Sequence, residues 1–550
     1  MRRSALLLML AIATGAVALV IAIGADDERF ARGNEAERIP PPLAAGGDAP
    51  APTGRRGAPP EVAAGAREWP LPNRDYANTR ATTDSAIDAS TVDQLGLAWT
   101  YEVRGPSHWG AAATAPLIAG DVAYVQDLKS NLAALDLRTG HPRWRRNIDE
   151  EAFGPNGPAI GWGRIYAHDG ANALRAFDLR TGRPAWSRPL AGPTGAQQPV
   201  AFDGLVYTGL PAGRRLKVQP GKLQIRLVGP GSSGFLYGIR ADDGAAVWDF
   251  QTVEPGFWGD PDVNSGAGVW FPPAVDTATG RTFWSTGNPA PAPGTRDHPN
   301  ASSRPGPNLY ANTVLAFERD GGKAWHNQPQ PRDIFHHDLQ NPPILARAGG
   351  RDLVVASGKG GIVYALDRAS GDLVWERPVG EHRNDTLTEL PAGERPVEVL
   401  PGFWGGVETP GAFADGTLYY LTENLATPYT STAWRSRSAD ENVPNLEGRT
   451  DLERGTSELV AIDAATGEVR WTHAFDQVGF GGVTVVNDLV FTATYDGRVR
   501  ALRRSDGEEV WTFQAPAGIN AWPAVAGDTI VWPAGVGREP VVFALRLGAS

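Results

Sequence analysis

The stretch LVAIDAATGEVRW, residues 459–471, alternates apolar and polar positions, turns on Asp-Ala-Ala-Thr-Gly and reaches a tryptophan four residues after the glycine. Alternation with a period of two on both sides of a short Gly-containing turn is typical of an antiparallel β-hairpin. The pattern occurs seven times, in copies that end at Trp144, Trp186, Trp248, Trp325, Trp375, Trp471 and Trp511. Repeats at spacings of about 40 residues or more predict sheets that stack on their neighbours. We expect each tryptophan, at its constant offset, to pack between two adjacent sheets.

The two ends of this repeat region supply an eighth copy in two parts. Residues 541–550, VVFALRLGAS, contain the apolar strand without the tryptophan, and residues 95–103, LGLAWTYEV, contain the tryptophan strand without its partner. Joining them would seal a ring of sheets and leave no open sheet edge. The sequence therefore predicts an all-β fold, an eight-bladed β-propeller closed by pairing of N- and C-terminal strands and preceded by one N-terminal hydrophobic helix.

The composition excludes several classes of partner and several kinds of site. The chain has 550 residues, a net charge of -11, 66 glycines, 46 prolines and no cysteine. The acidity, and the lack of a basic run interleaved with aromatic residues, exclude nucleic acid as a partner. The lack of cysteine excludes disulfides, thiol catalysis, cysteine-ligated metal clusters, a Cys-x-x-Cys-His haem site and a lipobox-type lipid anchor.

The N-terminus predicts the compartment. Arg2 and Arg3 precede an uncharged apolar run, Ala5–Ala25, which is long enough to span a bilayer as one helix. Small residues at Ala22–Gly24 leave open a cleaved signal peptide and a secreted protein. Either way we expect an extracytoplasmic propeller, periplasmic or at the cell surface. The expected divisions are a membrane anchor or signal segment at 1–25, a disordered Pro/Ala/Gly-rich linker at 26–67 and the propeller at 68–550.

Four intervals between repeats are longer than a four-stranded blade needs. They are rich in Pro, Gly, Trp and Asn, and they span Pro189–Ser233, Gln251–Asn312, Trp325–Asp352 and Glu376–Glu458. Loops of this size usually carry function. We expect them to be ordered and to cover one mouth of the central channel.

Four segments of the chain resemble one family. They are FWSTGNPAP around Asn288, GPNLYANTVLAF from Gly306, QPRDIFHHDLQNPP from Gln330 and SGKGGIVYALDRASG around Lys359. With them the chain resembles the pyrroloquinoline quinone (PQQ)-dependent dehydrogenases, eight-bladed propellers that oxidise alcohols or sugars in the periplasm. The resemblance implies PQQ in the channel with Ca²⁺ or another divalent metal. It also implies an alcohol or sugar substrate and a separate electron acceptor, since no haem motif is present.

Three residues match the family's cofactor pocket. Trp270 lies where the family has a channel tryptophan, Asn288 where it has a metal-ligating amide, and Lys359 where it has the basic residue beside the quinone. Each also has an ordinary interpretation: Trp270 as a further structural aromatic residue, Asn288 as a turn residue before proline, and Lys359 as a solvated lysine. The resemblance implies cofactor binding by Trp270 and Lys359 and metal binding by Asn288.

The catalytic position departs from the family. His336 stands where the family has its aspartate base, with Asp333 and Asp338 on either side. A neutral imidazole can accept a proton near pH 7, so we expect His336, Asp333 and Asp338 to form the catalytic group. A structural role for His336 stays open, and so does a transition-metal site that these three residues would form with His337.

Other departures support a second hypothesis. No carboxylate lies near Gly231–Gly234, where the family has a calcium-ligating glutamate, and no basic residue precedes the strand near Arg164. The family's adjacent-cysteine pair is also missing. Glu408 and Asn424 are polar residues in segments that could face the channel, with no role indicated by their spacing. The two hypotheses are a quinoprotein-type oxidoreductase and a non-catalytic, membrane-anchored binding or scaffold module.

Overall fold

The computed structural model describes residues 55–65, 67–105, 110–152, 154–192, 197–212, 217–219, 222–224, 233–393, 395–431 and 451–549. The predicted hydrophobic helix lies outside these ranges, as does most of the predicted linker. Within the part of the chain that is described, no helix is long and apolar enough to cross a membrane.

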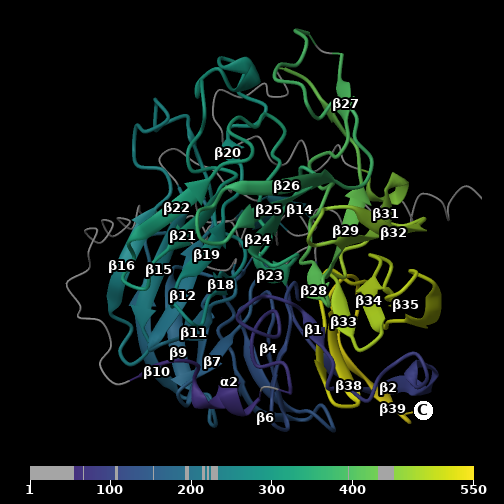
Figure 1. Ribbon diagram of the computed structural model, residues 1–550. Helices are drawn as coiled ribbons and strands as arrows, with labels where there is room; N and C mark the ends of the chain where they lie inside the picture. The colour runs from purple at the N-terminus through teal and green to yellow at the C-terminus, as the bar shows by residue number, and fades with distance from the viewer. Residues whose placement is uncertain are drawn as a thin grey trace, which may run out of the picture. The chain divides into compact units, whose positions relative to one another are not determined.

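Eight sheets, each with four antiparallel strands and one of them extended by a fifth, parallel strand, confirm the predicted eight-bladed propeller (Figure 1). Blades 1 to 4 consist of β3 (Leu117–Ala119), β4 (Val122–Gln126), β5 (Leu132–Asp136) and β6 (Pro142–Arg146); β7 (Ala159–Gly161), β8 (Arg164–His168), β9 (Ala173–Asp178) and β10 (Pro184–Pro189); β11 (Val200–Phe202), β12 (Leu205–Leu210), β15 (Phe235–Arg240) and β16 (Ala246–Gln251); and β18 (Ala274–Val275), β19 (Thr282–Ser285), β21 (Val314–Phe317) and β22 (Lys323–Asn327). Blades 5 to 8 consist of β23 (Ile344–Ala348), β24 (Arg351–Ser357), β25 (Ile362–Asp367) and β26 (Leu373–Pro378); β28 (Ala412–Ala414), β29 (Thr417–Asn424), β31 (Thr456–Asp463) and β32 (Val469–Phe475); β33 (Thr484–Val486), β34 (Leu489–Ala493), β35 (Arg498–Arg503) and β36 (Glu509–Gln514); and β37 (Ala524–Ala526), β38 (Thr529–Ala534), β39 (Val541–Leu547) and β2 (Leu95–Glu102).

The remaining elements are short and lie before the blades or in the insertions. They are α2 (Pro60–Ala64), β1 (Ala81–Thr82), β13 (Lys217–Gln219), β14 (Lys222–Gln224), β17 (Ser265–Gly266), β20 (Pro289–Ala290), β27 (Val397–Val399), β30 (Thr427–Tyr429) and single 3-10 turns at Val92–Gln94, Pro299–Ala301 and Leu452–Arg454.

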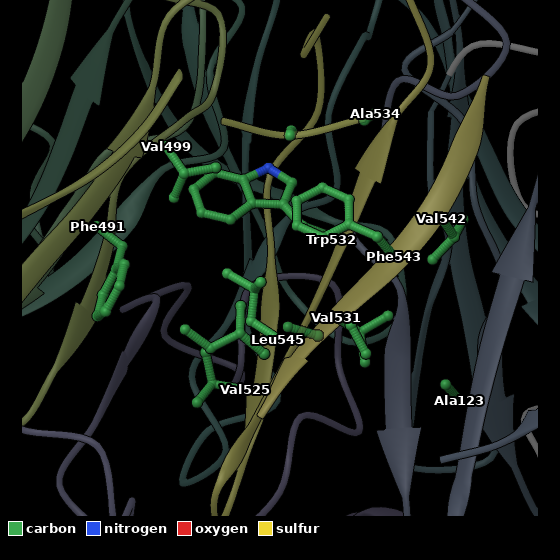
Figure 2. Packing of buried hydrophobic residues seen from close by; sticks show 14 of the residues in the cluster. Ala123, Phe491, Val499, Val525, Val531, Trp532, Ala534, Val542, Phe543 and Leu545 are labelled. Carbon is green, nitrogen blue, oxygen red and sulfur yellow. The ribbon is translucent and has the colours of Figure 1, made fainter. Parts of the chain in front are cut away.

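The closure of the ring follows the predicted split blade. β2 pairs antiparallel with β39, and Trp99 lies opposite Ala544. Trp532 of the same blade is fully buried and packs with Phe543 and Leu545 in the core of Figure 2. An N-terminal strand therefore occupies the outer edge of the C-terminal blade, and the first and last parts of the propeller hold each other.

The repeated tryptophans pack between blades as predicted, and the structure also explains the repeated glycine. Trp144 of blade 1 donates from Nε1 to the carbonyl of Leu179 in blade 2 at 3.1 Å and lies over Gly182 of the same turn. Gly182 has φ +64°, and a Cβ added there would lie 2.7 Å from the indole. All the repeat tryptophans except Trp511 pack in this way on a glycine in the turn of the next blade, and that turn needs glycine both for its backbone and for the close approach.

Two glycine substitutions separate these effects. Gly182→Ala and Gly163→Ala both place alanine at positive φ, which costs about 1–2 kcal/mol of the free energy of unfolding, but a Cβ at Gly163 meets nothing within 4 Å. We expect Gly182→Ala to lower that free energy by about 1–3 kcal/mol more, because the indole must shift. Denaturant titration of both variants measures the difference. Equal losses would contradict indole docking as the reason for the glycine.

A segment before the first blade, Trp69–Thr82, crosses from blade to blade; we call it the crossing segment. Its backbone pairs with β3 at Trp69, and β1, at its end, runs parallel to β33. Between these points it bonds to four further blades through Tyr76, Ala77 and Thr79. The segment therefore ties together six of the eight blades.

Two further features adjoin the blades. Residues 55–65, part of the predicted linker, include α2 and contact the propeller: Glu61 accepts the backbone N–H of Trp162 at 2.8 Å. The described parts of the insertions pack on one another, because Asn300 exchanges two hydrogen bonds with the backbone of Leu390. β20 and β27, from two of these insertions, lie at the same end in Figure 1.

Candidate active site

One cavity in the propeller brings several predicted site residues together. Its lining combines aromatic side chains with a few polar groups from different blades: Trp270, Phe271, Trp404, Phe480, Trp522, His336, Lys359, Glu408, Gln340, Thr409 and Asn520. The predicted residues Trp270, His336 and Lys359 are therefore neighbours although they are far apart in sequence. A mostly apolar cavity with a few converging polar groups is the usual form of a small-molecule site.

His336 is held in an unusual conformation. Its backbone lies in the left-handed region, with φ 67°, and its ring packs on Phe403 at 4.4 Å between centroids. Nδ1 lies 3.3 Å from Oδ2 of Asp338, but neither ring nitrogen makes a hydrogen bond to another described residue. The side chain is only 4% exposed. A strained, buried residue with an unsatisfied polar atom facing a cavity is a typical feature of functional sites.

Lys359 and Asp338 form a buried ion pair. Lys359 Nζ lies 2.9 Å from Asp338 Oδ2 and 4.7 Å from the ring centroid of Trp404. Burial favours the neutral form of Asp338, but the ammonium of Lys359 and then the imidazole of His336 outweigh burial and keep the pKa of Asp338 below its ordinary value. Burial acts against the charge of Lys359 as well, but Asp338 and Glu408 hold its pKa above the ordinary value. Both groups are therefore ionised at neutral pH.

Two glutamates adjoin this pair. Glu408 lies 3.8 Å from Lys359 Nζ and accepts a hydrogen bond from Gln340 Nε2 at 3.1 Å. Burial raises the pKa of Glu408 to about 8. Behind it, Glu423 accepts the backbone N–H of Glu408 at 3.2 Å, and burial, followed by the nearby Glu408, raises the pKa of Glu423 well above its ordinary value. At neutral pH the site thus contains one carboxylate, one ammonium and two protonated carboxyl groups.

A glycine sets the distance between the two loops. In the motif Ser-Gly-Lys-Gly-Gly, Gly358 packs so tightly on the carbonyl of Asp338 that a Cβ would overlap it. The backbone N–H of Lys359 donates to the same carbonyl at 2.9 Å. The glycine beside the lysine therefore holds the ion pair at short range.

Two predicted residues have their polar groups engaged outside the cavity lining. The Asn288 side chain donates to the carbonyl of Pro289 at 2.9 Å, while its backbone N–H donates to Asp338 Oδ1 at 2.8 Å. The Asp333 carboxylate accepts the backbone N–H groups of Phe335 and His337, both at 2.7 Å. Asn288 thus positions Asp338, and Asp333 shapes the loop that presents His336. Their roles in metal binding and catalysis stay predictions.

The acidic donors needed by a hard metal ion are few. Among the described residues, no group of three or more His, Asp or Glu side chains is arranged to hold a metal. The sequence from 213 to 241 contains no Asp or Glu, so the family's glutamate ligand has no counterpart there.

The chain is similar to known proteins over most of its length. The family model "Glucose/ethanol/alcohol dehydrogenase, beta-propeller domain" matches residues 226–385, and the model "Outer membrane protein assembly factor BamB" matches residues 84–256 and 425–544. The quinohemoprotein alcohol dehydrogenase of Comamonas testosteroni is 26% identical over 528 residues, which cover 83% of this chain and 70% of the relative. Its crystal structure superposes with a TM-score of 0.74 at 21% identity, covering 89% of this chain and 82% of that chain. The chain is a PQQ-dependent alcohol dehydrogenase-like eight-bladed β-propeller.

Two further proteins extend the comparison. The 1-butanol dehydrogenase (cytochrome c) of Thauera butanivorans is 26% identical over 525 residues, 83% of this chain and 72% of the relative. A europium-containing methanol dehydrogenase has a TM-score of 0.71 at 19% identity, covering 88% of this chain and 98% of that chain. The structural matches show that the propeller fold is shared.

Sequence reasoning missed part of the site of this PQQ-dependent alcohol dehydrogenase-like propeller. Trp404 and Trp522 line the cavity but lie outside the repeat, and Glu423 is the second-last residue of strand β29, whose sequence is that of an ordinary strand. The motif GFWGGVETP contained the only local signal, because it holds both Trp404 and Glu408. Asn424, the other polar residue singled out, instead bonds to the backbone of Glu381 and to Glu458.

Proposed function

We propose that this protein is an extracytoplasmic quinoprotein-type oxidoreductase that oxidises an alcohol, a polyol or a sugar with a PQQ-type cofactor in the cavity. The alcohol dehydrogenase relatives support this reaction class. The observation that carries the proposal is His336, which lines a cavity together with a buried lysine and whose ring nitrogens make no hydrogen bond to another described residue. By analogy with the name of the Thauera relative, electrons would pass to a separate acceptor such as a cytochrome c. The N-terminal run Ala5–Ala25 would anchor the protein in the membrane or direct its secretion.

The lining of the cavity fits a flat quinone. Three indoles, Trp270, Trp404 and Trp522, offer aromatic faces, and Lys359 supplies a cation for a quinone oxygen. A bound quinone would supply the oxidant that accepts a hydride from the alcohol carbon. The protein would contribute the orientation of both partners, the exclusion of water and the transfer of the hydroxyl proton.

His336 is placed to take that proton. Nε2 can accept the proton of an alcohol that enters the cavity, while Asp338, 3.3 Å from Nδ1, orients the ring and stabilises the imidazolium that forms. The ammonium of Lys359, 2.9 Å from Asp338 Oδ2, keeps that carboxylate ionised. The pair formed by His336 and Asp338 would thus do the work of a single aspartate base.

The proposal is tested on the full-length chain in mild detergent. The protein is incubated with PQQ in chelator, with Ca²⁺ or with La³⁺, desalted, and assayed for dye reduction with primary alcohols, polyols and sugars. We expect quinone absorbance to stay with the protein and at least one substrate class to reduce the dye. If no quinone is retained and no dye is reduced under any of these conditions, the proposed oxidoreductase function is refuted. The hypothesis of a non-catalytic binding or scaffold module is then favoured.

A further inference from the structure

The Asp338 carboxylate is enclosed by groups of the chain itself. Oδ1 accepts the backbone N–H of Asn288, and Oδ2 contacts the ammonium of Lys359 at 2.9 Å and Nδ1 of His336 at 3.3 Å. With a side chain 1% exposed, Asp338 has no water-facing side on which a further ligand could bind. A cation could reach this carboxylate only by displacing the lysine.

The other oxygen donors near Lys359 are weak ones for a hard cation. Glu408 is protonated at neutral pH, because burial raises its pKa to about 8, and its Oε2 already accepts from Gln340. Asn288 offers an uncharged amide, whose Nδ2 is bonded to Pro289. Calcium usually takes six to eight oxygen ligands that include carboxylates, and a lanthanide is also a hard, oxygen-seeking ion. The described donors therefore do not fit such an ion.

The positive charge of Lys359 also opposes the binding of a metal ion in this pocket. The ammonium of Lys359 is buried among Asp338, Glu408 and the face of Trp404, where the effective dielectric constant is low. A divalent ion bound to Asp338 would lie within a few ångströms of that ammonium, and two like charges at this distance in a buried site strongly oppose each other. The ammonium of Lys359 already balances the negative charge of Asp338, which is the one ionised carboxylate of the pocket.

We propose that Lys359 is the resident cation of this pocket and stands in for the divalent metal, so that the protein binds its quinone without calcium or a lanthanide. The quinone part of this inference rests on the proposed function. The cation part does not, because it concerns how the apo-protein responds to metal ions. Two arms of one experiment therefore separate the two parts.

In the first arm, full-length protein stripped with chelator is melted alone and with millimolar Ca²⁺ or La³⁺, without quinone. We expect the melting temperature to change by less than about 1 °C, since an ion that does not bind the folded state does not stabilise it. Stabilisation of the wild type by either ion that is lost in Asp338→Asn would overturn the inference, whether or not PQQ binds.

In the second arm, PQQ affinity is measured by quenching of tryptophan fluorescence. We expect the dissociation constants in chelator and with either ion to agree within about threefold, as for a ligand whose binding is not linked to the metal. A gain of about tenfold or more with either ion would overturn the inference. No quenching under any condition would refute the proposed quinone site, and the first arm would still decide the cation question.

Variants of Lys359 provide a further test in both arms of the experiment. Lys359→Ala frees Asp338, so we expect this variant, unlike the wild type, to be stabilised by Ca²⁺ or La³⁺ and to bind PQQ at least about tenfold more weakly in chelator than with metal. Lys359→Arg keeps the charge and should stay insensitive to metal. Lys129→Ala, which breaks an ion pair with Glu151 outside the cavity, is the matched control for nonspecific effects. If Lys359→Ala fails to fold, the wild-type and Lys359→Arg measurements still decide the outcome.

Discussion

Replacing His336 with asparagine is expected to lower the rate of alcohol oxidation by at least about 100-fold, the usual loss when a general base is removed. Asparagine is chosen because it tolerates the left-handed backbone of this position better than alanine does. The amide cannot accept the hydroxyl proton, but it fills most of the space of the imidazole. The measurement is single-turnover reduction of PQQ-loaded protein by excess alcohol.

Three observations make this result specific to proton transfer. The melting temperature and the PQQ dissociation constant of His336→Asn should stay close to the wild-type values. The residual rate should rise with pH, since hydroxide can replace the missing base. A rate within about threefold of the wild type would rule out His336 as the base and return that role to a carboxylate.

Replacing Arg80 with alanine is expected to lower the free energy of unfolding by about 3–5 kcal/mol. The guanidinium is fully buried in the crossing segment and donates to the carbonyl oxygens of Val483 and Pro523 and to Oγ1 of Thr484. The substitution leaves these acceptors unsatisfied in the interior and opens a cavity. The midpoint of thermal or denaturant unfolding, followed by tryptophan fluorescence, measures the loss.

The same chain offers a matched control for Arg80. Arg67 lies shortly before the crossing segment and is exposed, so Arg67→Ala should change stability by less than about 0.5 kcal/mol. Arg80→Lys should remain strongly destabilised, because an ammonium cannot reach the same set of acceptors as the planar guanidinium. Equal stability of Arg80→Ala and Arg67→Ala would show that the crossing segment does not hold the blades together.

The blades could be predicted from the sequence because each copy of the repeat contains the local features that determine its structure. In every repeat the alternation sets the strands, the glycine sets the turn and the tryptophan sets the contact with the next blade. The closing blade was predictable for the same reason, since Trp99 lacked a partner strand and the C-terminal strand lacked a tryptophan. Local periodicity determines this part of the fold.

The crossing segment could not be predicted in the same way. Its residues show no periodic pattern, and their partners are distant: Asn78 bonds to Pro343, 265 residues away, and Arg80 to Pro523, 443 residues away. Nothing in the local sequence indicates such contacts. The short helix α2 was missed for a related reason, because its five residues are too few for a helical period.

The candidate site was predictable only in outline. The motifs placed Trp270, His336 and Lys359 in one cavity, as the structure shows. They could not show that Lys359 pairs with Asp338, because that contact depends on how two loops turn toward each other. Asp333 illustrates the limit, since its carboxylate bonds to its own loop although its motif position suggested chemistry.

The long-range contacts of the crossing segment affect when the protein can fold during its synthesis. Its residues leave the ribosome early, but the groups that bind Arg80 follow more than 400 residues later. Until these groups are synthesised, Arg80 lacks these partners. In the same way, β2 cannot pair until β39, at the other end of the propeller sequence, has been synthesised. A chain that lacks β39 therefore exposes blade edges that the closed propeller hides, so a chaperone that shields nascent β-strands would be most needed until β39 has been synthesised.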